Sequence, residues 1–253
     1  MRVDLNCDMG ESFGAYTIGA DELVMPLITS ANIACGFHGG DPLVMRRTVR
    51  LAKQHGVAIG AHPGFRDLAG FGRRPLECTP EEIHADVLYQ IGALAGICRA
   101  ERAELSHVKP HGALYNMAAV NVHVARAIAR AVADFDPRLI LYAMPGSALQ
   151  QAGEEAGLKV AAEVFADRTY NPDGTLVSRS RPGSVLSDET AAAVQARKMV
   201  VTGRVTAITG EEIPVRAETI CVHGDNPHAV ALIQRIRKEL QTAGITLSAP
   251  DRQ

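Results

Sequence analysis

Carboxylate and imidazole side chains recur in this sequence at the points where short apolar runs end. The first run is followed by Asp8 and Glu11, two carboxylates three residues apart. Such a pair can hold a metal ion, or can serve as a general acid and a general base. Alternatively, Asp8 caps the turn and Glu11 is solvated. The spacing alone favours neither interpretation.

His38 lies in a glycine-flanked turn directly before Asp41-Pro42, a strong helix-start signal. Free backbone amides and the helix dipole make such a turn an anion site. Gly36, His38 and Gly39 are therefore candidates for holding a carboxylate or phosphate, although the glycines can equally serve only the dihedral angles of the turn. A phosphate-binding loop that ends in Lys-Ser or Lys-Thr occurs nowhere in the chain, so we recognise no nucleotide site of its own.

Two further runs end in His62 and in Lys109-Pro110-His111. His62 is a candidate metal ligand or catalytic base. A lysine in a strand that otherwise faces the core is costly unless it is paired or functional. Beside carboxylates Lys109 would stabilise charge, and with a lowered pKa it would act as a base. The spacing of His107 and His111 also suits a two-histidine metal site, but on a strand the pair would lie roughly 13 Å apart.

The last runs are followed by Asp167-Arg168 and by His223-Gly224-Asp225, and Arg179 lies in a basic loop between them. Arginine binds carboxylates and phosphates bidentately. Recurrence of polar clusters at six strand ends predicts an enzyme site. The catalytic candidates are Asp8, Glu11, His62, Lys109, His111 and Asp225, and the substrate-binding candidates are Gly36, His38, Gly39, Asp167, Arg168, Arg179 and His223.

Alternating strands and helices must position these residues. We expect strands at residues 2–6, 31–35, 57–61, 105–109, 139–144, 159–165 and 219–222, and a separate hairpin at 205–208 and 213–216. We expect helices at about 21–28, from Pro42 to Gly56, which ends that helix, and after the capping box at Thr79. Further helices are expected at about 121–133, just before Gly157, from a Ser187 cap to about 201, and from Asn226-Pro227 to about 243. The stretches 63–78 and 169–187 are predicted to be long ligand-facing loops.

Seven strands alternating with helices predict a parallel sheet. Periodicity does not distinguish an open sheet from a barrel. The spread of polar strand ends from the first run to the last favours closure, because only a ring places the first strand beside the seventh. All the polar clusters then lie at the one edge where such proteins have their active sites. With no linker or low-complexity segment, residues 1–253 are predicted to form a single domain.

Composition excludes several classes of protein. A net charge of −2 gives no reason to expect nucleic acid or an anionic membrane as a partner. The five cysteines are an odd number without a C-x-x-C pair, which favours a reduced, cytoplasmic protein. The amino terminus lacks the apolar segment of a signal peptide, and the apolar helical stretches are too short to cross a membrane.

Seven stretches, in the same order along nearly the whole chain, resemble the signatures of the LamB/YcsF lactam-utilisation family, whose members are also called the A subunit of 5-oxoprolinase. They are VDLNCDMGESFG (residues 3–14), ANIACGFHGGDP (31–42), GAHPG (60–64), GFGRR (70–74), VKPHGALYN (108–116), ADRTY (166–170) and CVHGD (221–225).

The resemblance implies an irregular seven-stranded (β/α) barrel related to the polysaccharide deacetylases. It also implies ATP-dependent hydrolysis of 5-oxo-L-proline to L-glutamate together with partner subunits B and C. Since this chain has no phosphate-binding loop, the ATP is assigned to the partners. Our hypothesis is that this chain completes the ring opening. Asp8 or Glu11 would orient or deprotonate water, and Lys109 with the histidines would stabilise the oxyanion and protonate the leaving nitrogen.

Two alternatives remain open from the sequence. One is a stand-alone metal-dependent amidohydrolase or deacetylase, in which Asp8, His62 and Asp225 hold a divalent metal. The other is a non-catalytic subunit that binds the lactam and delivers it to its partners. A homo-oligomer is compatible with either.

Overall fold

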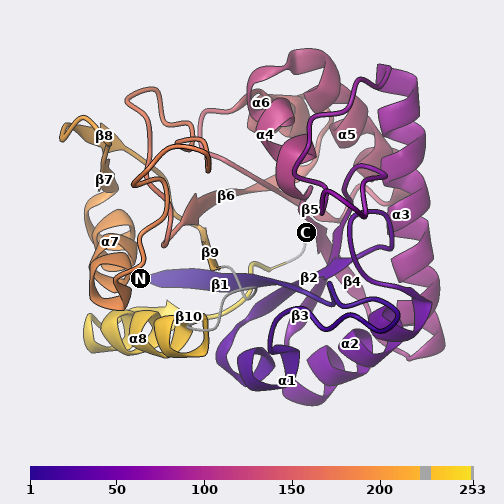
Figure 1. The fold of residues 1–253 in the computed structure, drawn as a ribbon, viewed down its shortest axis with the longest axis horizontal. Helices are drawn as coiled ribbons and strands as arrows, with labels where there is room; N and C mark the ends of the chain where they lie inside the picture. The colour runs from indigo at the N-terminus through magenta and orange to yellow at the C-terminus, as the bar shows by residue number, and fades with distance from the viewer. Residues whose placement is uncertain (223–228, 252–253) are drawn as a thin grey trace.

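The computed structural model describes residues 1–222 and 229–251. Within these residues, parallel strands close into a barrel (Figure 1). Its strands are β1 (Arg2–Met9), β2 (Ser30–Ala34), β3 (Ala58–His62), β4 (Leu105–Val108), β5 (Ile140–Ala143), β6 (Lys159–Phe165) and β9 (Thr219–Val222). Each strand pairs with the next in this order, and β9 also pairs with β1. The predicted seven-stranded (β/α) barrel is therefore confirmed.

Closure depends on β1, which is the strand that joins the two ends of the sheet. Its residues Asp4 to Cys7 pair with β9, and Asn6 to Met9 pair with β2. A short strand near the carboxyl terminus, β10 (Thr246–Leu247), adds a further parallel pairing at the start of β1 and was not predicted. The predicted hairpin is confirmed as β7 (Arg204–Thr206) and β8 (Glu212–Pro214), which pair antiparallel outside the barrel.

Helices pack around the outside of the barrel, for example α3 against α5 and α7 against α8 (Figure 1). They are α1 (Asp21–Val24), the 3-10 helix η1 (Met25–Leu27), α2 (Pro42–His55), α3 (Pro80–Ala100), α4 (Gly112–Val120), α5 (Val122–Phe135), α6 (Ala148–Glu155), α7 (Glu189–Thr202) and α8 (Ala229–Thr242). None of the helices in the described ranges combines the length and the apolar character needed to cross a bilayer.

Several predicted helix ends are confirmed by their capping contacts. The Asp41 carboxylate accepts hydrogen bonds from the amides of Leu43 and Val44, and Gly56 ends α2 with a left-handed φ of 65°. Thr79 forms the predicted capping box with Glu82 at the start of α3. These local signals are reliable because they satisfy backbone groups within a few residues.

Two helix predictions need correction, and one helix was missed. The helix expected at 21–28 is a single α-helical turn followed by η1, since Pro26 cannot donate a backbone hydrogen bond. The α7 cap is Asp188 rather than Ser187. The helix α4 was missed: it begins directly after His111, is almost uniformly apolar, and so lacks amphipathic spacing, while Asn121 caps the separate helix α5. The expected start of the last helix at Asn226-Pro227 lies outside the described residues.

The interior of the barrel is polar, whereas the layer between strands and helices is aliphatic. Along β1, Leu5, Cys7 and Met9 are buried in the apolar core, and the alternate residues Asp4 and Asn6 make polar contacts inside the ring. Asp4 accepts hydrogen bonds from Ser30, Tyr142 and Thr219, and Asn6 bonds to Asn32, Glu163 and Thr219. This network continues to Asp8 and the carboxyl end of the barrel.

Candidate active site at the carboxyl end of the barrel

A cavity of about 720 Å³ opens at the carboxyl ends of the strands, a size typical of small-molecule sites. Its floor is formed by Asp8, Glu11, His62, Lys109 and His111. Its walls come from the two long loops, with Phe71 and Arg73 from residues 63–79 and Arg168 and Arg179 from residues 166–188.

Lys109 connects the polar interior of the barrel to this cavity. Its Nζ lies 3.0 Å from Asp8 Oδ1 and 3.1 Å from Glu163 Oε1, and it donates to Cys221 Sγ at 2.9 Å. The side chain is only 3% exposed. Burial lowers the pKa of Lys109, but Asp8, Cys221 and Glu163 together raise it well above its ordinary value. Of the two roles open to this lysine, the geometry favours a protonated charge stabiliser.

Asp8 lies between Lys109 and the histidines. Its Oδ1 accepts hydrogen bonds from Lys109 Nζ and, at 2.9 Å, from Asn32 Nδ2, while its Oδ2 lies 3.2 Å from His62 Nε2. The Asp8 side chain is 11% exposed and reaches the cavity. It is held in place by donors on one oxygen and presents the other oxygen to the imidazoles.

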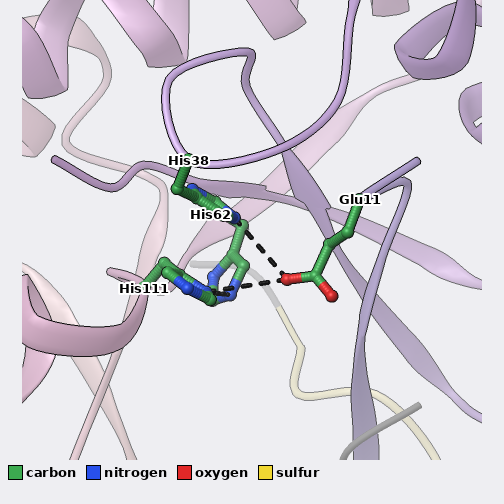
Figure 2. Close-up of side chains that lie close together, drawn as sticks. All are labelled: Glu11, His38, His62 and His111. Atoms are coloured by element: carbon green, nitrogen blue, oxygen red, sulfur yellow. Dashed lines mark hydrogen bonds and ion pairs between the residues drawn. The ribbon is translucent and has the colours of Figure 1, made fainter. Parts of the chain in front are cut away.

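Glu11, His38, His62 and His111 form a compact buried cluster beside Asp8 (Figure 2). One ligand atom from each residue lies within 4.8 Å of the others. His111 Nδ1 is 2.9 Å from His62 Nε2 and 3.7 Å from Glu11 Oε1, and His38 Nε2 is 3.6 Å from the same oxygen. The His38 and His111 rings stack with centroids 3.7 Å apart. Burial is the main cause that lowers the pKa of both His38 and His111.

The two wall loops are held by arginines. Arg168 donates to the carbonyl oxygens of Ser184 and Val177, and burial together with neighbouring Arg179 lowers its pKa to about 10. Arg74 pairs with Asp67 across the other loop. Arg168 thus secures the 166–188 loop as well as lining the cavity, and Arg179 is a cation at the cavity wall.

The structure brings together Asp8, Glu11, His62, Lys109, His111, Arg168 and Arg179 around one cavity. His38 is packed behind His111, away from the lining. Gly36 and Gly39 are also absent from the lining, and the Gly36 amide donates to the Gly39 carbonyl at 2.9 Å. Asp167 is buried. His223 and Asp225 lie outside the described residues, so their assignments stay predictions.

Sequence reasoning missed several residues that support this site: Asn6, Asn32, Tyr115 and Glu163. One signal was available. Asp4, Asn6 and Asp8 alternate with apolar residues in the first strand, and this period of two indicates one polar and one apolar face. Glu163 sits in the same way among apolar neighbours in β6.

Comparison with solved structures supports the fold. The chain resembles a solved deacetylase, T48, with a TM-score of 0.50 at 16% identity, over 100% of this chain and 93% of that one. At this identity the likeness concerns the fold alone. It agrees with the expected deacetylase-like barrel fold.

Closer relatives identify the family. The A subunit of 5-oxoprolinase from Symbiobacterium thermophilum is 67% identical over 98% of this chain and 95% of its own length. The crystal structure of the lactam utilization protein from Thermus thermophilus superposes with a TM-score of 0.94 at 51% identity, over 99% of this chain and 100% of that chain. The LamB/YcsF family model matches residues 3–253. With its barrel, its cavity and these matches over nearly its whole length, the chain belongs to the LamB/YcsF family.

Proposed function

We propose that this chain is the A subunit of a 5-oxoprolinase, which acts with subunits B and C to hydrolyse 5-oxo-L-proline to L-glutamate at the expense of ATP. Family membership and the names of the relatives support the reaction. The observation that carries it is the cavity floor, where a buried ammonium, a carboxylate and imidazoles converge.

The chemistry explains why ATP is needed. The lactam amide is stabilised by resonance, so water attacks its carbonyl carbon only slowly. Transfer of the ATP γ-phosphoryl group to the lactam oxygen would make that carbon more electrophilic. That transfer releases ADP. Attack by one water and cleavage of the ring C–N bond then give the acyl phosphate of glutamate, and a second water hydrolyses this acyl phosphate to L-glutamate and inorganic phosphate. Because we recognise no nucleotide site in this chain, we assign the activation to subunits B and C and the ring opening to this chain.

Asp8 is positioned to orient and deprotonate the attacking water, since one of its oxygens faces the histidines at the cavity floor. Lys109, 3.0 Å from the other oxygen, supplies a fixed positive charge for the negative charge of the phosphorylated lactam oxygen. Such preorganised charges act strongly in a site shielded from water. Glu11, His62 and His111 complete the floor, where a proton must reach the leaving nitrogen.

Arg168 and Arg179 are the groups we assign to the anionic part of the substrate. Both line the cavity, and guanidinium groups match the geometry of carboxylates and phosphates. The cavity is larger than a five-membered lactam, which leaves room for a phosphorylated intermediate. The five cysteines, all free in the structure, support a reducing, cytoplasmic setting for this reaction.

The test is glutamate release from 5-oxoproline and ATP by this chain alone, by subunits B and C alone, and by all three. We expect release only from the full mixture. Equal release from subunits B and C alone would remove this chain from the reaction. Amide hydrolysis by this chain alone, without ATP, would instead support the stand-alone amidohydrolase.

A further inference from the structure

The contact between His62 and His111 poses a chemical problem. Their facing nitrogens, His62 Nε2 and His111 Nδ1, are 2.9 Å apart. The other nitrogen of each ring lies against a backbone carbonyl, with His62 Nδ1 2.6 Å from the Lys109 oxygen and His111 Nε2 2.8 Å from the Phe71 oxygen. A carbonyl oxygen only accepts, so these outer nitrogens carry the ring hydrogens. Without a proton or cation between them, the two facing nitrogens therefore direct lone pairs at each other.

His38 presents a second unsatisfied polar group to the same point. It is fully buried, and among the described residues neither of its ring nitrogens has a hydrogen-bond partner. Buried polar atoms without partners are rare and call for an explanation. The Nε2 atom of His38 faces the carboxylate of Glu11, which also faces His111 Nδ1 (Figure 2).

The distances between these ligand atoms, and the partners of the outer ring nitrogens, are compatible with a metal centre. A tetrahedral zinc ion with bonds of about 2.0–2.1 Å places its ligand atoms roughly 3.3 Å apart. Three of the six contacts between the four ligand atoms measure 2.9, 3.6 and 3.7 Å, and all six lie within 4.8 Å. Ligating histidines usually donate their other ring hydrogen to a carbonyl or carboxylate, as His62 and His111 do here.

We propose that Glu11, His38, His62 and His111 bind a divalent first-row transition metal of the zinc type. Three imidazole nitrogens and one carboxylate oxygen suit such an ion better than Mg²⁺ or Ca²⁺, which prefer oxygen ligands. This ligand set shares His62 with the Asp8, His62 and Asp225 set expected for a stand-alone hydrolase, and Glu11 with the carboxylate pair that could hold a metal ion. Asp8, beside His62, lies next to the site rather than within the cluster of ligand atoms.

Binding of the ion does not depend on the proposed reaction, but the role we give the ion rests on the proposed function. Glu11, His62 and His111 line the cavity, so an ion held by them would be next to the bound lactam. A divalent ion supplies Lewis-acid polarisation of a carbonyl oxygen or lowers the pKa of a bound water. The protein contributes a fixed ligand geometry and the neighbouring Asp8 carboxylate.

The first experiment measures metal content and affinity in the full-length chain without a histidine tag. Protein purified in the absence of chelator is analysed by plasma mass spectrometry, for which we expect about one zinc-type ion per chain. The chain is then stripped with dipicolinate and titrated with Co²⁺, and we expect saturable visible absorption bands. Zn²⁺ should displace the Co²⁺ signal, whereas Mg²⁺ should not.

Glu11→Gln and His38→Gln test the ligand set. Each should weaken Co²⁺ binding by more than roughly 100-fold, beyond the 10–100-fold typical of changes outside the ligands. His55→Ala and His123→Ala, two exposed histidines on helices, are the matched controls and should bind as the wild type does. Zinc should also raise the Tm of the wild type but not of Glu11→Gln, and far-UV circular dichroism establishes that each variant is folded.

A proton shared between His62 and His111 is the competing occupant of the cluster. Wild-type protein that carries no metal and gives no Co²⁺ bands would establish that alternative and overturn the proposal. Co²⁺ affinity that is unchanged in folded Glu11→Gln and His38→Gln would also overturn it. Neither measurement uses the substrate, so a failure of the proposed reaction leaves this result unaffected.

Discussion

Lys109 and Asp8 link the buried polar network of the barrel to the open cavity. The ammonium is held between the carboxylates of Asp8 and Glu163, and the latter is fully buried. A buried charge is tolerated only when it is paired and hydrogen-bonded. The same pairing that stabilises the interior therefore holds the two groups that we assign to water activation and charge stabilisation.

Asp8→Asn should abolish most of the turnover with little effect on folding. The amide keeps the shape of the side chain and an oxygen for Lys109, but it cannot accept a proton from water. We expect glutamate release by the three-subunit mixture to fall by about 10²–10⁴-fold, the range for loss of a general base. Glu81→Gln, on the surface at the start of α3, is the control. Release within a few-fold of wild type would exclude the assigned role.

Lys109→Met should cost both activity and stability. It leaves the buried Glu163 carboxylate and the partly exposed Asp8 carboxylate without their shared cation, and loss of a buried partner typically costs about 3–5 kcal/mol of unfolding free energy. Adding Glu163→Gln should restore part of that stability, because it removes one of the uncompensated charges, but should not restore turnover. Urea denaturation of the single and double variants measures the coupling. Additive losses of stability would contradict the pairing.

His107 should lower the free energy of unfolding as the pH becomes acidic. Its ring is buried, donates from Nε2 to Asn32 Oδ1 at 2.8 Å, and stacks on Tyr142, and burial lowers its pKa to about 3 from 6.5. Between these values the unfolded state binds the extra proton and the native state does not. Stability is therefore lost as the pH falls from 6.5 towards 3, by up to about 1.4 kcal/mol per pH unit.

The check is a comparison of wild type with His107→Asn by urea denaturation at several pH values. The variant lacks the titrating group, so the stability advantage of the wild type should shrink as the pH is lowered. An advantage that stays constant between about pH 6.5 and about pH 4 would show that His107 does not contribute this dependence.

At the scale of elements, strands β3 and β4 must approach closely to place His107 inside the ring. Gly60 allows it: a Cβ atom at this position would lie 2.0 Å from His107 Nε2. The register between the two strands shifts at this glycine. Thus a residue without chemistry of its own determines whether an imidazole fits in the barrel interior.

Gly60→Ala should destabilise the protein by at least about 1–3 kcal/mol, the usual cost of overpacking a core. Gly96→Ala is the matched control, because Gly96 is exposed in α3 and an added Cβ would meet nothing within 4 Å. That substitution should stabilise the protein by about 0.5–1 kcal/mol through helix propensity. Thermal or urea unfolding compares the two, and equal effects would refute the close approach of His107.

At the scale of the whole molecule, closure is what assembles the site. The amino-terminal strand β1 pairs with β2 and also with β9 and β10, which lie near the carboxyl end of the chain. Strands from both ends of the sequence are therefore neighbours in the barrel. Lys109 from beyond β4 then contacts Asp8 of β1, Glu163 of β6 and Cys221 of β9. An open sheet would separate these partners.

This arrangement predicts cooperative unfolding of residues 1–253 as one domain. Neither end of the chain can detach without breaking the pairing of β1 with its neighbours. Far-UV circular dichroism and the near-UV signal of the tyrosines should give coincident urea transitions, which is the usual test of two-state behaviour. Two separated transitions would indicate independent units.

Much of the fold was accessible from the sequence because its signals are local. The caps at Asp41 and Thr79, the terminal Gly56 and the alternation of apolar strands depend on residues within a few positions of one another. The clustering of Asp8, His62, Lys109 and His111 also followed, since parallel strands bring their carboxyl ends to one edge. The helix α4 escaped because a uniformly apolar helix has no period to detect.

Only the tertiary structure decided which neighbours each of these residues acquires. Sequence spacing left Lys109 as either a base or a charge stabiliser, and its contacts with Asp8 and Glu163 favour the ammonium. The sequence grouped His62 with Asp8 and Asp225 as metal ligands. The fold places Asp8 3.2 Å from His62 and adds Glu11, His38 and His111 around it, while Asp225 lies outside the described residues. The physical reason is that burial, charge pairing and ring orientation depend on side chains that come from strands far apart in the chain. These three properties are defined only once the barrel is closed.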